Sequence, residues 1–191
     1  AIRISPEGDE YDKDVASGIR YAVDNGAKVV NLSFGKYTSP HPEMVNEAIA
    51  YAAKHDVLVI AAAGNNHLNI DSVDYFPAAV DAKGKTFDNF IRVGGTAMDG
   101  SRSSISNYGA HKVDLYATGE YISGVYPGDK KDFANGTSVA APVVTGIAAM
   151  LRSYFPKVKA AQLKRILIET AHHVHGLKLV DAAAAVKRLM P

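Results

Sequence analysis

The chain has 191 residues, of which 47% are hydrophobic and 21% charged, a composition typical of a soluble globular domain. Its 21 Lys and Arg residues nearly balance its 20 Asp and Glu residues, which argues against a nucleic-acid-binding surface built on bulk charge. The sequence has no cysteine, which excludes disulfides, thiolate metal sites and a cysteine nucleophile, and no apolar run approaches the ~20 residues that span a bilayer.

The first half of the chain alternates between helical and strand patterns. Apolar residues recur at helical spacing over 12–25, and Pro42 can open a second helix with an apolar stripe from Val45 to Ala52. Residues 28–34 and the uninterrupted apolar run 57–63 indicate strands covered on both faces. This order of elements predicts an α/β fold with a mostly parallel central sheet and right-handed crossovers.

The second half is less regular. Short strands are predicted at 90–93, ending at Gly94-Gly95, and at 113–117. The turn signal Pro127-Gly128-Asp129 separates two further strand patterns and therefore predicts a hairpin over 121–134. The later apolar segments predict three helices, at 139–151, 160–171 and 182–189.

Two residues stand where catalytic groups are often found. Ser138 follows a glycine turn at the start of the buried helix, where free backbone N–H groups and the helix dipole favour negative charge. Asn65 follows the strand 57–63 at the carboxyl edge of the sheet, where its side chain can donate a hydrogen bond to an oxyanion. Taken alone, Ser138 is better explained as a helix N-cap and Asn65 as a turn residue.

The surrounding residues change that interpretation. Gly136-Thr137-Ser138-Val139-Ala140-Ala141-Pro142 matches the nucleophile signature G-T-S-x-A-x-P, Ala62-Ala63-Gly64-Asn65 matches an oxyanion-hole segment, and Val29–Gly35 matches a substrate-binding strand. In this order, these segments resemble the subtilisin-like serine proteases, the subtilase family. Weaker matches follow the same family order, at Phe76-Pro77-Ala78, Val93-Gly94-Gly95, Ser106-Asn107-Tyr108-Gly109 and Ala117-Thr118-Gly119.

The resemblance implies a role for each matched residue. Ser138 would be the nucleophile, and its backbone N–H and the Asn65 side chain would hold the oxyanion. Ser33, Phe34 and Gly35 would pair with the substrate backbone by strand addition. Ala62, Ala63 and Gly64 would line the pocket for the side chain of the residue before the cut. Thr137 would be a further substrate-binding residue.

The same resemblance implies a subtilisin-like three-layer fold and shows what the chain lacks. The family needs an Asp and a His that precede the substrate-binding strand, yet no histidine precedes Ser33. Asp9, Asp12 and Asp14 lack the family's D-[ST]-G context. Because a serine without a general base is a poor nucleophile, we expect residues 1–191 to be a partial subtilase catalytic domain, inactive in isolation. The missing N-terminal strands, Asp and His would lie upstream of Ala1.

The other histidines do not replace the missing base. His67 follows Asn65 by two residues, but the sequence offers no partner that would orient it. His172, His173 and His175 are better explained as a polar helix end than as a metal cluster, so no metal ligands are predicted. Calcium is implied by family analogy only, because no carboxylate cluster can be assigned to it.

Two hypotheses follow for the function. The first is a serine endopeptidase with peptide or protein substrates, of which this chain is a fragment. The second is a non-catalytic subtilase-like module that binds peptides or a partner chain along Ser33–Gly35, although the retained Ser138 and Asn65 count against it. An incomplete sheet with an open edge predicts that the isolated chain associates with itself. Analogy with the family suggests that the protein is extracellular or located in the cell envelope.

Overall fold

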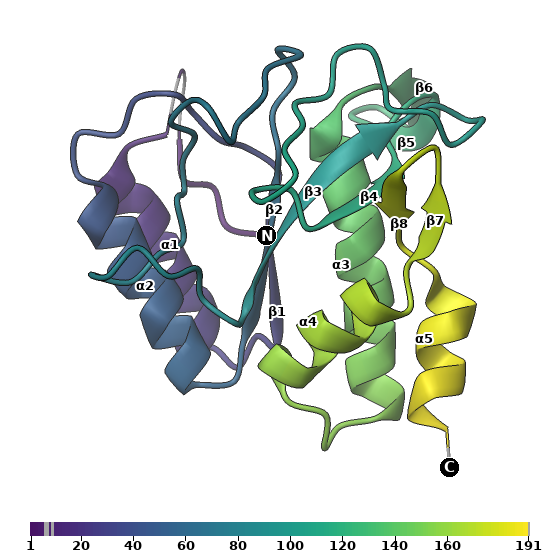
Figure 1. Ribbon diagram of the computed structural model, residues 1–191. Coiled ribbons are helices and arrows are strands. Elements are labelled where there is room, and N and C mark those ends of the chain that lie inside the picture. The colour runs from purple at the N-terminus through teal and green to yellow at the C-terminus, as the bar shows by residue number, and fades with distance from the viewer. Residues whose placement is uncertain (6–7, 9, 191) are drawn as a thin grey trace.

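The computed structural model describes residues 1–5, 8 and 10–190. Helices and strands follow one another along these residues as labelled in Figure 1. Their bounds are α1 (Asp12–Asp24), β1 (Val29–Leu32), α2 (Pro42–Lys54), β2 (Leu58–Ala62), β3 (Phe90–Thr96), β4 (Leu115–Thr118), β5 (Ile122–Tyr126), β6 (Lys130–Ala134), α3 (Thr137–Tyr154), α4 (Ala160–Glu169), β7 (His172–Val174), β8 (Leu177–Leu179) and α5 (Ala182–Leu189).

The central sheet has six strands in the order β1-β2-β3-β4-β8-β7. β1 to β4 pair in parallel with their neighbours, and β8 joins β4 in parallel, so that only β7 runs antiparallel to its partner. Because β1 to β4 all run the same way, their carboxyl ends meet at one edge of the sheet. The sheet is therefore mostly parallel, as predicted.

Helices cover both faces of this sheet. In Figure 1, α1 and α2 lie on one side, and α3, α4 and α5 lie on the other. Each side has its own apolar cluster, one built with Val15, Ile19 and Ile49 and the other with Val144 and Leu163. The three layers confirm the α/β fold that was expected from the resemblance.

The uninterrupted apolar run of β2 is explained by this double cover. Val59 and Ala61 pack into the cluster of α1 and α2, whereas Leu58 and Ile60 pack into the cluster of α3 and α4. All of these side chains have 0% exposed surface. A strand buried on both faces needs apolar residues at every position, which removes the alternation typical of half-exposed strands.

One predicted strand and one predicted helix were too short. β3 does not end before Gly94-Gly95 but continues to Thr96, since residues 93–96 pair in register with β4. The N–H of Gly95 also donates to the Ser106 hydroxyl at 2.9 Å, which holds the glycine segment in place. The predicted helix over 139–151 spans Thr137–Tyr154, so that Ser138 lies within its first turn.

The prediction that His172, His173 and His175 end a helix was wrong. α4 ends at Glu169, and the three histidines belong to β7 and to the tight turn into β8. His175 and Gly176 both have positive φ, at 50° and 78°, as a two-residue hairpin turn requires. The pair His175-Gly176 between two three-residue strands was the signal for this hairpin.

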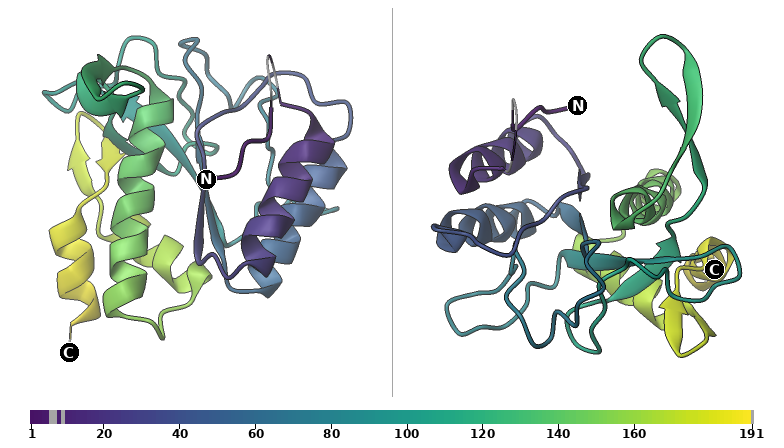
Figure 2. Two further views of the ribbon diagram at one scale, coloured as in Figure 1. Left: turned by 180° about the vertical axis from the view of Figure 1, so that it is seen from behind. Right: turned by 90° about the horizontal axis from the view of Figure 1, so that it is seen from above.

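The predicted hairpin over 121–134 is confirmed as β5 and β6, which pair antiparallel in a separate two-stranded sheet. Figure 2 shows this hairpin projecting from the body of the molecule. Among the described residues, no helix has the length and apolar character of a membrane-spanning segment.

Candidate functional site

Three segments converge at the carboxyl edge of the sheet. Residues 33–35 follow β1, residues 63–65 follow β2, and Thr137 and Ser138 open α3. α3 packs across β1, β2, β3 and β4, which brings its first turn to the ends of the strands. The predicted nucleophile, oxyanion asparagine and substrate-binding segment are therefore brought together.

Thr137 joins the end of β2 to the start of α3. Its hydroxyl accepts a hydrogen bond from the Gly64 N–H at 2.9 Å and donates one to Asn65 Oδ1 at 2.9 Å. The Thr137 N–H donates to the same Asn65 oxygen at 2.8 Å. Because Oδ1 accepts both bonds, the amide has a fixed orientation and its Nδ2 faces away from Thr137.

The free end of the Asn65 amide and the Ser138 hydroxyl lie on the same side of Gly136. A Cβ placed on Gly136 would lie 2.9 Å from Asn65 Nδ2 and 3.2 Å from Ser138 Oγ. The φ of Gly136, 135°, is also one that other residues rarely adopt. Glycine at this position leaves open the space that the two polar groups share.

The first turn of α3 adds a backbone donor. The N–H groups of Val139 and Ala140 bond to the Gly136 carbonyl, and the Thr137 N–H bonds to Asn65. In the described part of the chain, the Ser138 N–H is left without an acceptor. A free N–H at the positive end of a helix, beside an oriented amide N–H, is suited to an oxyanion.

A second set of hydrogen bonds fixes Ser138 from the side of β1. Ser33 Oγ donates to the Ser138 carbonyl at 2.7 Å and accepts from Asn31 Nδ2 at 2.7 Å. Thr145, two turns along α3, donates to Asn31 Oδ1 at 2.9 Å. Ser33 therefore positions the helix through its side chain. Asn31 and Thr145, which sequence reasoning did not single out, complete the connection.

Asn107 is a further residue that the sequence did not reveal as important. Its side chain is buried and donates to the Ala63 carbonyl and to the Tyr37 hydroxyl, each at 2.8 Å. Its Oδ1 accepts from the N–H groups of Asn66 and Leu68. These bonds hold the exposed loop that follows Asn65. The only signal was its place in the motif Ser106-Asn107-Tyr108-Gly109.

His67 belongs to that loop and not to the environment of Ser138. Its Nδ1 lies 2.8 Å from the Ser104 carbonyl, and its ring packs against Tyr108 with centroids 5.8 Å apart. Over residues 1–5, 8 and 10–190, no group of three or more His, Asp or Glu side chains could hold a metal ion. The described carboxylates therefore form no cluster that could hold calcium by themselves.

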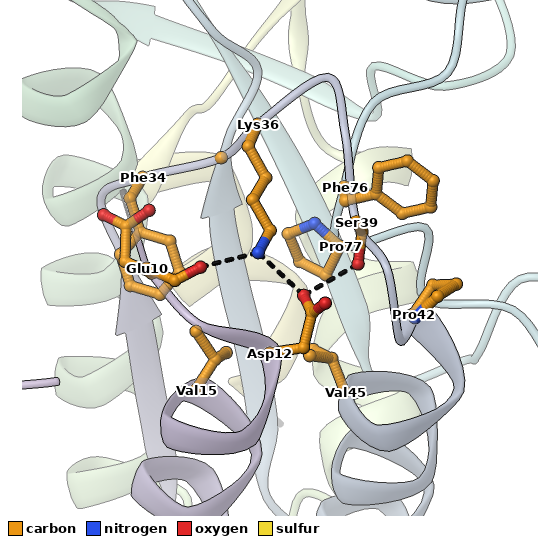
Figure 3. Close-up of a pocket in the computed structure, with 11 residues that line it drawn as sticks. Glu10, Asp12, Val15, Phe34, Lys36, Ser39, Pro42, Val45, Phe76 and Pro77 are labelled. Atoms are coloured by element: carbon orange, nitrogen blue, oxygen red, sulfur yellow. Dashed lines mark hydrogen bonds and ion pairs between the residues drawn. The ribbon is translucent and has the colours of Figure 1, made fainter. Parts of the chain in front are cut away.

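A small cavity beside the predicted substrate-binding segment is closed by a buried ion pair (Figure 3). Asp12, at the start of α1, lies 2.8 Å from Lys36 Nζ and accepts from the Ser39 hydroxyl at 2.7 Å and the His41 N–H at 3.0 Å. Lys36 Nζ also donates to the Glu10 carbonyl at 2.6 Å. Asp12 thus ties the chain that follows Gly35 to α1.

The sequence analysis named three aspartates that precede Ser33. Asp9 lies outside the described residues, Asp12 is engaged in the ion pair with Lys36, and Asp14 lies in the first turn of α1. Burial alone would raise the pKa of the Asp12 carboxyl, but the bonds from Lys36, Ser39 and the His41 N–H lower it below its usual value. Asp12 is therefore ionised at neutral pH and serves to position the chain.

The Thr137 hydroxyl is expected to contribute to stability through the Gly64 N–H. Thr137→Val keeps the side-chain shape but leaves that buried N–H without an acceptor, which should lower the free energy of unfolding by about 1–3 kcal/mol. Urea unfolding at neutral pH measures the change. Thr137→Ser keeps the hydroxyl and is the matched control. Equal stability of the two variants would contradict this role.

The Asp12 ion pair predicts a pH-dependent contribution to stability. Because folding lowers the pKa of Asp12, its stabilisation is present above the unfolded value of about 3.9 and is lost as the pH falls through the folded value. We expect Asp12→Asn to be less stable than the wild type at neutral pH, with the difference shrinking in acid. Urea unfolding across this range tests it, with the exposed Asp88→Asn as control. A difference that is constant with pH would contradict the assignment.

Comparison with known proteins agrees with this geometry. The sequence model of the subtilase family matches residues 1–187. The chain is 35% identical over 179 residues to M-protease of Shouchella clausii (strain KSM-K16), covering 91% of this chain and 43% of that protein. It is also 35% identical over 179 residues to Subtilisin BL of Lederbergia lenta, covering 91% of this chain and 61% of that protein. The chain therefore spans less than two thirds of the length of these relatives.

Solved structures give the same result for the fold. A protease structure from Pseudoalteromonas arctica PAMC 21717 has a TM-score of 0.84 at 26% identity, covering 98% of this chain and 62% of that one. The Prenylagaramide maturation protease PagA has a TM-score of 0.85 at 24% identity, covering 98% and 72%, and shares the fold. By the family match, the relatives and the fold, the chain belongs to the subtilase family.

Proposed function

We propose that the protein containing this chain is a serine endopeptidase of the subtilisin type, in which Ser138 is the nucleophile. The observation that carries the proposal is the shared space beside Gly136, which the Ser138 hydroxyl and the oriented Asn65 amide both border, at the helix start where the described residues leave the Ser138 N–H free. Such a space fits a carbonyl carbon near the hydroxyl and its oxygen near the two N–H donors.

In this reaction, Ser138 Oγ attacks the carbonyl carbon of the scissile peptide bond while a general base takes the hydroxyl proton. The carbonyl oxygen becomes negative and is stabilised by the Ser138 N–H and the Asn65 amide. The C–N bond then breaks, the amine leaves with the proton, and an ester to Ser138 remains. Water hydrolyses this ester and regenerates the hydroxyl.

Substrate binding would use the segment that follows β1. Residues 33–35 extend past the paired part of the sheet, and β1 pairs with β2 on one edge only. An extended peptide can add there as a further strand, which would present its carbonyl groups to the start of α3. The peptide or protein nature of the substrate follows from this binding mode.

The general base is proposed to come from a part of the protein outside this chain. In the described residues, no histidine or carboxylate forms a hydrogen bond with Ser138, and His67 is held at Ser104. A hydroxyl without a base is a weak nucleophile, so the 191 residues alone should be inactive. By analogy with the family, we place the whole protein outside the cell or in its envelope.

Activity measurements on the full-length protein and on residues 1–191 test the proposal. We expect peptide hydrolysis by the full-length protein only, and its loss in Ser138→Ala. The loss of kcat should be on the order of 10⁶, which is the known scale for a subtilisin itself. A fluorophosphonate probe should label Ser138, as shown by peptide mass spectrometry.

The exposed Ser153→Ala variant, on the same helix, is the matched control and should keep full activity. Ordinary protease rates from residues 1–191 through Ser138 would show that no outside base is needed. A full-length protein without hydrolysis, but with affinity for extended peptides, would instead favour the non-catalytic binding module.

The open edge of β1 predicts that residues 1–191 alone self-associate. β1 is the terminal strand of the sheet and has backbone groups that no other described strand pairs. Analytical ultracentrifugation over a range of protein concentrations should show dimers or larger species for residues 1–191. The full-length protein is the control. A strictly monomeric chain at all concentrations would contradict the prediction.

A further inference from the structure

The two segments that border the expected side-chain pocket run side by side. β1 and β2 are adjacent, with Leu32 opposite Ala61; residues 33–35 follow β1, and residues 62–64 run from the last residue of β2 into the chain after it. A substrate strand lying along the first segment would direct one side chain between the two. The free space between these segments therefore decides which residue can precede the scissile bond.

The phenol end of Tyr75 occupies this space. A Cβ placed on Gly35 would lie 2.6 Å from Tyr75 Cζ, and a Cβ placed on Gly64 would lie 2.8 Å from the same atom. The ring thus contacts both segments at once. Tyr75 has only 4% of its surface exposed, which shows how closely its surroundings enclose it.

Backbone bonds hold Tyr75 at this position. The N–H of Phe76 donates to the Lys36 carbonyl at 2.8 Å, and the Lys36 N–H donates to the Phe76 carbonyl at 3.2 Å. These two bonds join the residue after Tyr75 to the residue after Gly35. Lys36 is itself anchored to α1 by the Asp12 ion pair. The position of the Tyr75 ring is therefore tied to the substrate-binding segment and, through Lys36, to α1.

Side-chain contacts hold the ring as well. Tyr37 packs edge-on against it with centroids 5.1 Å apart, and the Arg92 guanidinium lies 5.4 Å from its centroid. Burial raises the pKa of the Tyr75 phenol to about 12, so the ring is neutral at physiological pH. The aromatic contact and the cation–π contact both favour the buried position of this neutral ring.

We propose that Tyr75 closes the side-chain pocket and restricts the substrate residue before the scissile bond to glycine or alanine. This inference rests on the proposed function and names the substrate class of the same site. A large side chain at that position would have to displace the Tyr75 ring, whereas a small one leaves the ring in place. Tyr75 is thus a specificity-determining residue.

The test uses the full-length protein and peptides that differ only in the residue before the cut, which is Ala, Leu or Phe. The wild type should prefer Ala over Phe in kcat/KM by at least about tenfold. Tyr75→Ala removes the ring and should raise kcat/KM for Phe by about 10- to 100-fold. Tyr75→Phe keeps the ring in the pocket and should retain the wild-type preference.

Tyr154→Ala, at the exposed end of α3, is the matched control and should leave the preference unchanged. If Tyr75→Ala fails to fold, the wild type and Tyr75→Phe still decide, because preferred cleavage after Phe by either would overturn the inference.

A binding measurement separates this inference from the proposed function. Product peptides that end in Ala or in Phe are titrated by calorimetry into the Ser138→Ala protein, where no turnover occurs. Tighter binding of the Ala peptide supports the closed pocket even if no peptide is hydrolysed, and tighter binding of the Phe peptide overturns it. If the full-length wild type shows no Ser138-dependent hydrolysis at all, that result contradicts the proposed function alone.

Discussion

The hydrogen bonds of Thr137 are the constraint on which the candidate site depends. They connect the residues that follow a buried parallel strand to the first residue of the longest helix, and they fix the orientation of the Asn65 amide. Without them, Asn65 would be an exposed side chain with both ends of its amide free to exchange. Thr137 therefore fixes both the junction between α3 and the end of β2 and the direction in which the Asn65 amide N–H points.

The remaining contacts make this arrangement rigid on its other sides. Ser33 and Asn31 connect β1 to α3, and Asn107 holds the loop after Asn65. These polar side chains bond mainly to backbone groups or to one another, so their donors and acceptors are used within the fold. Groups that are held in place need no reorganisation when charge develops beside them, which is the physical basis of electrostatic catalysis.

Much of this could be predicted from the sequence, because the relevant signals are local. The run 57–63 lacks alternation since both faces of β2 are covered, and Gly136 is needed where a side chain would block Asn65 and Ser138. Tyr75 could not be placed in this way. Its position depends on the pairing of Phe76 with Lys36, a long-range contact without a local pattern. The histidines at 172–175 were misassigned because a short hairpin leaves little periodicity to detect.

Hydrogen bonds at the base of the β5–β6 hairpin separate its projecting strands from the residues around Ser138. The two parts should differ in how well they tolerate insertions. The Gly136 N–H donates to the Gly119 carbonyl at 2.7 Å, and the Tyr121 N–H donates to Asn135 Oδ1 at 2.6 Å. These two bonds join the chain that enters the hairpin to the chain that leaves it. Beyond this closure the hairpin projects into solvent (Figure 2). Residues near its tip at 127–129 are consequently a place where the chain can be lengthened, or a reporter group inserted, with the geometry around Ser138 preserved.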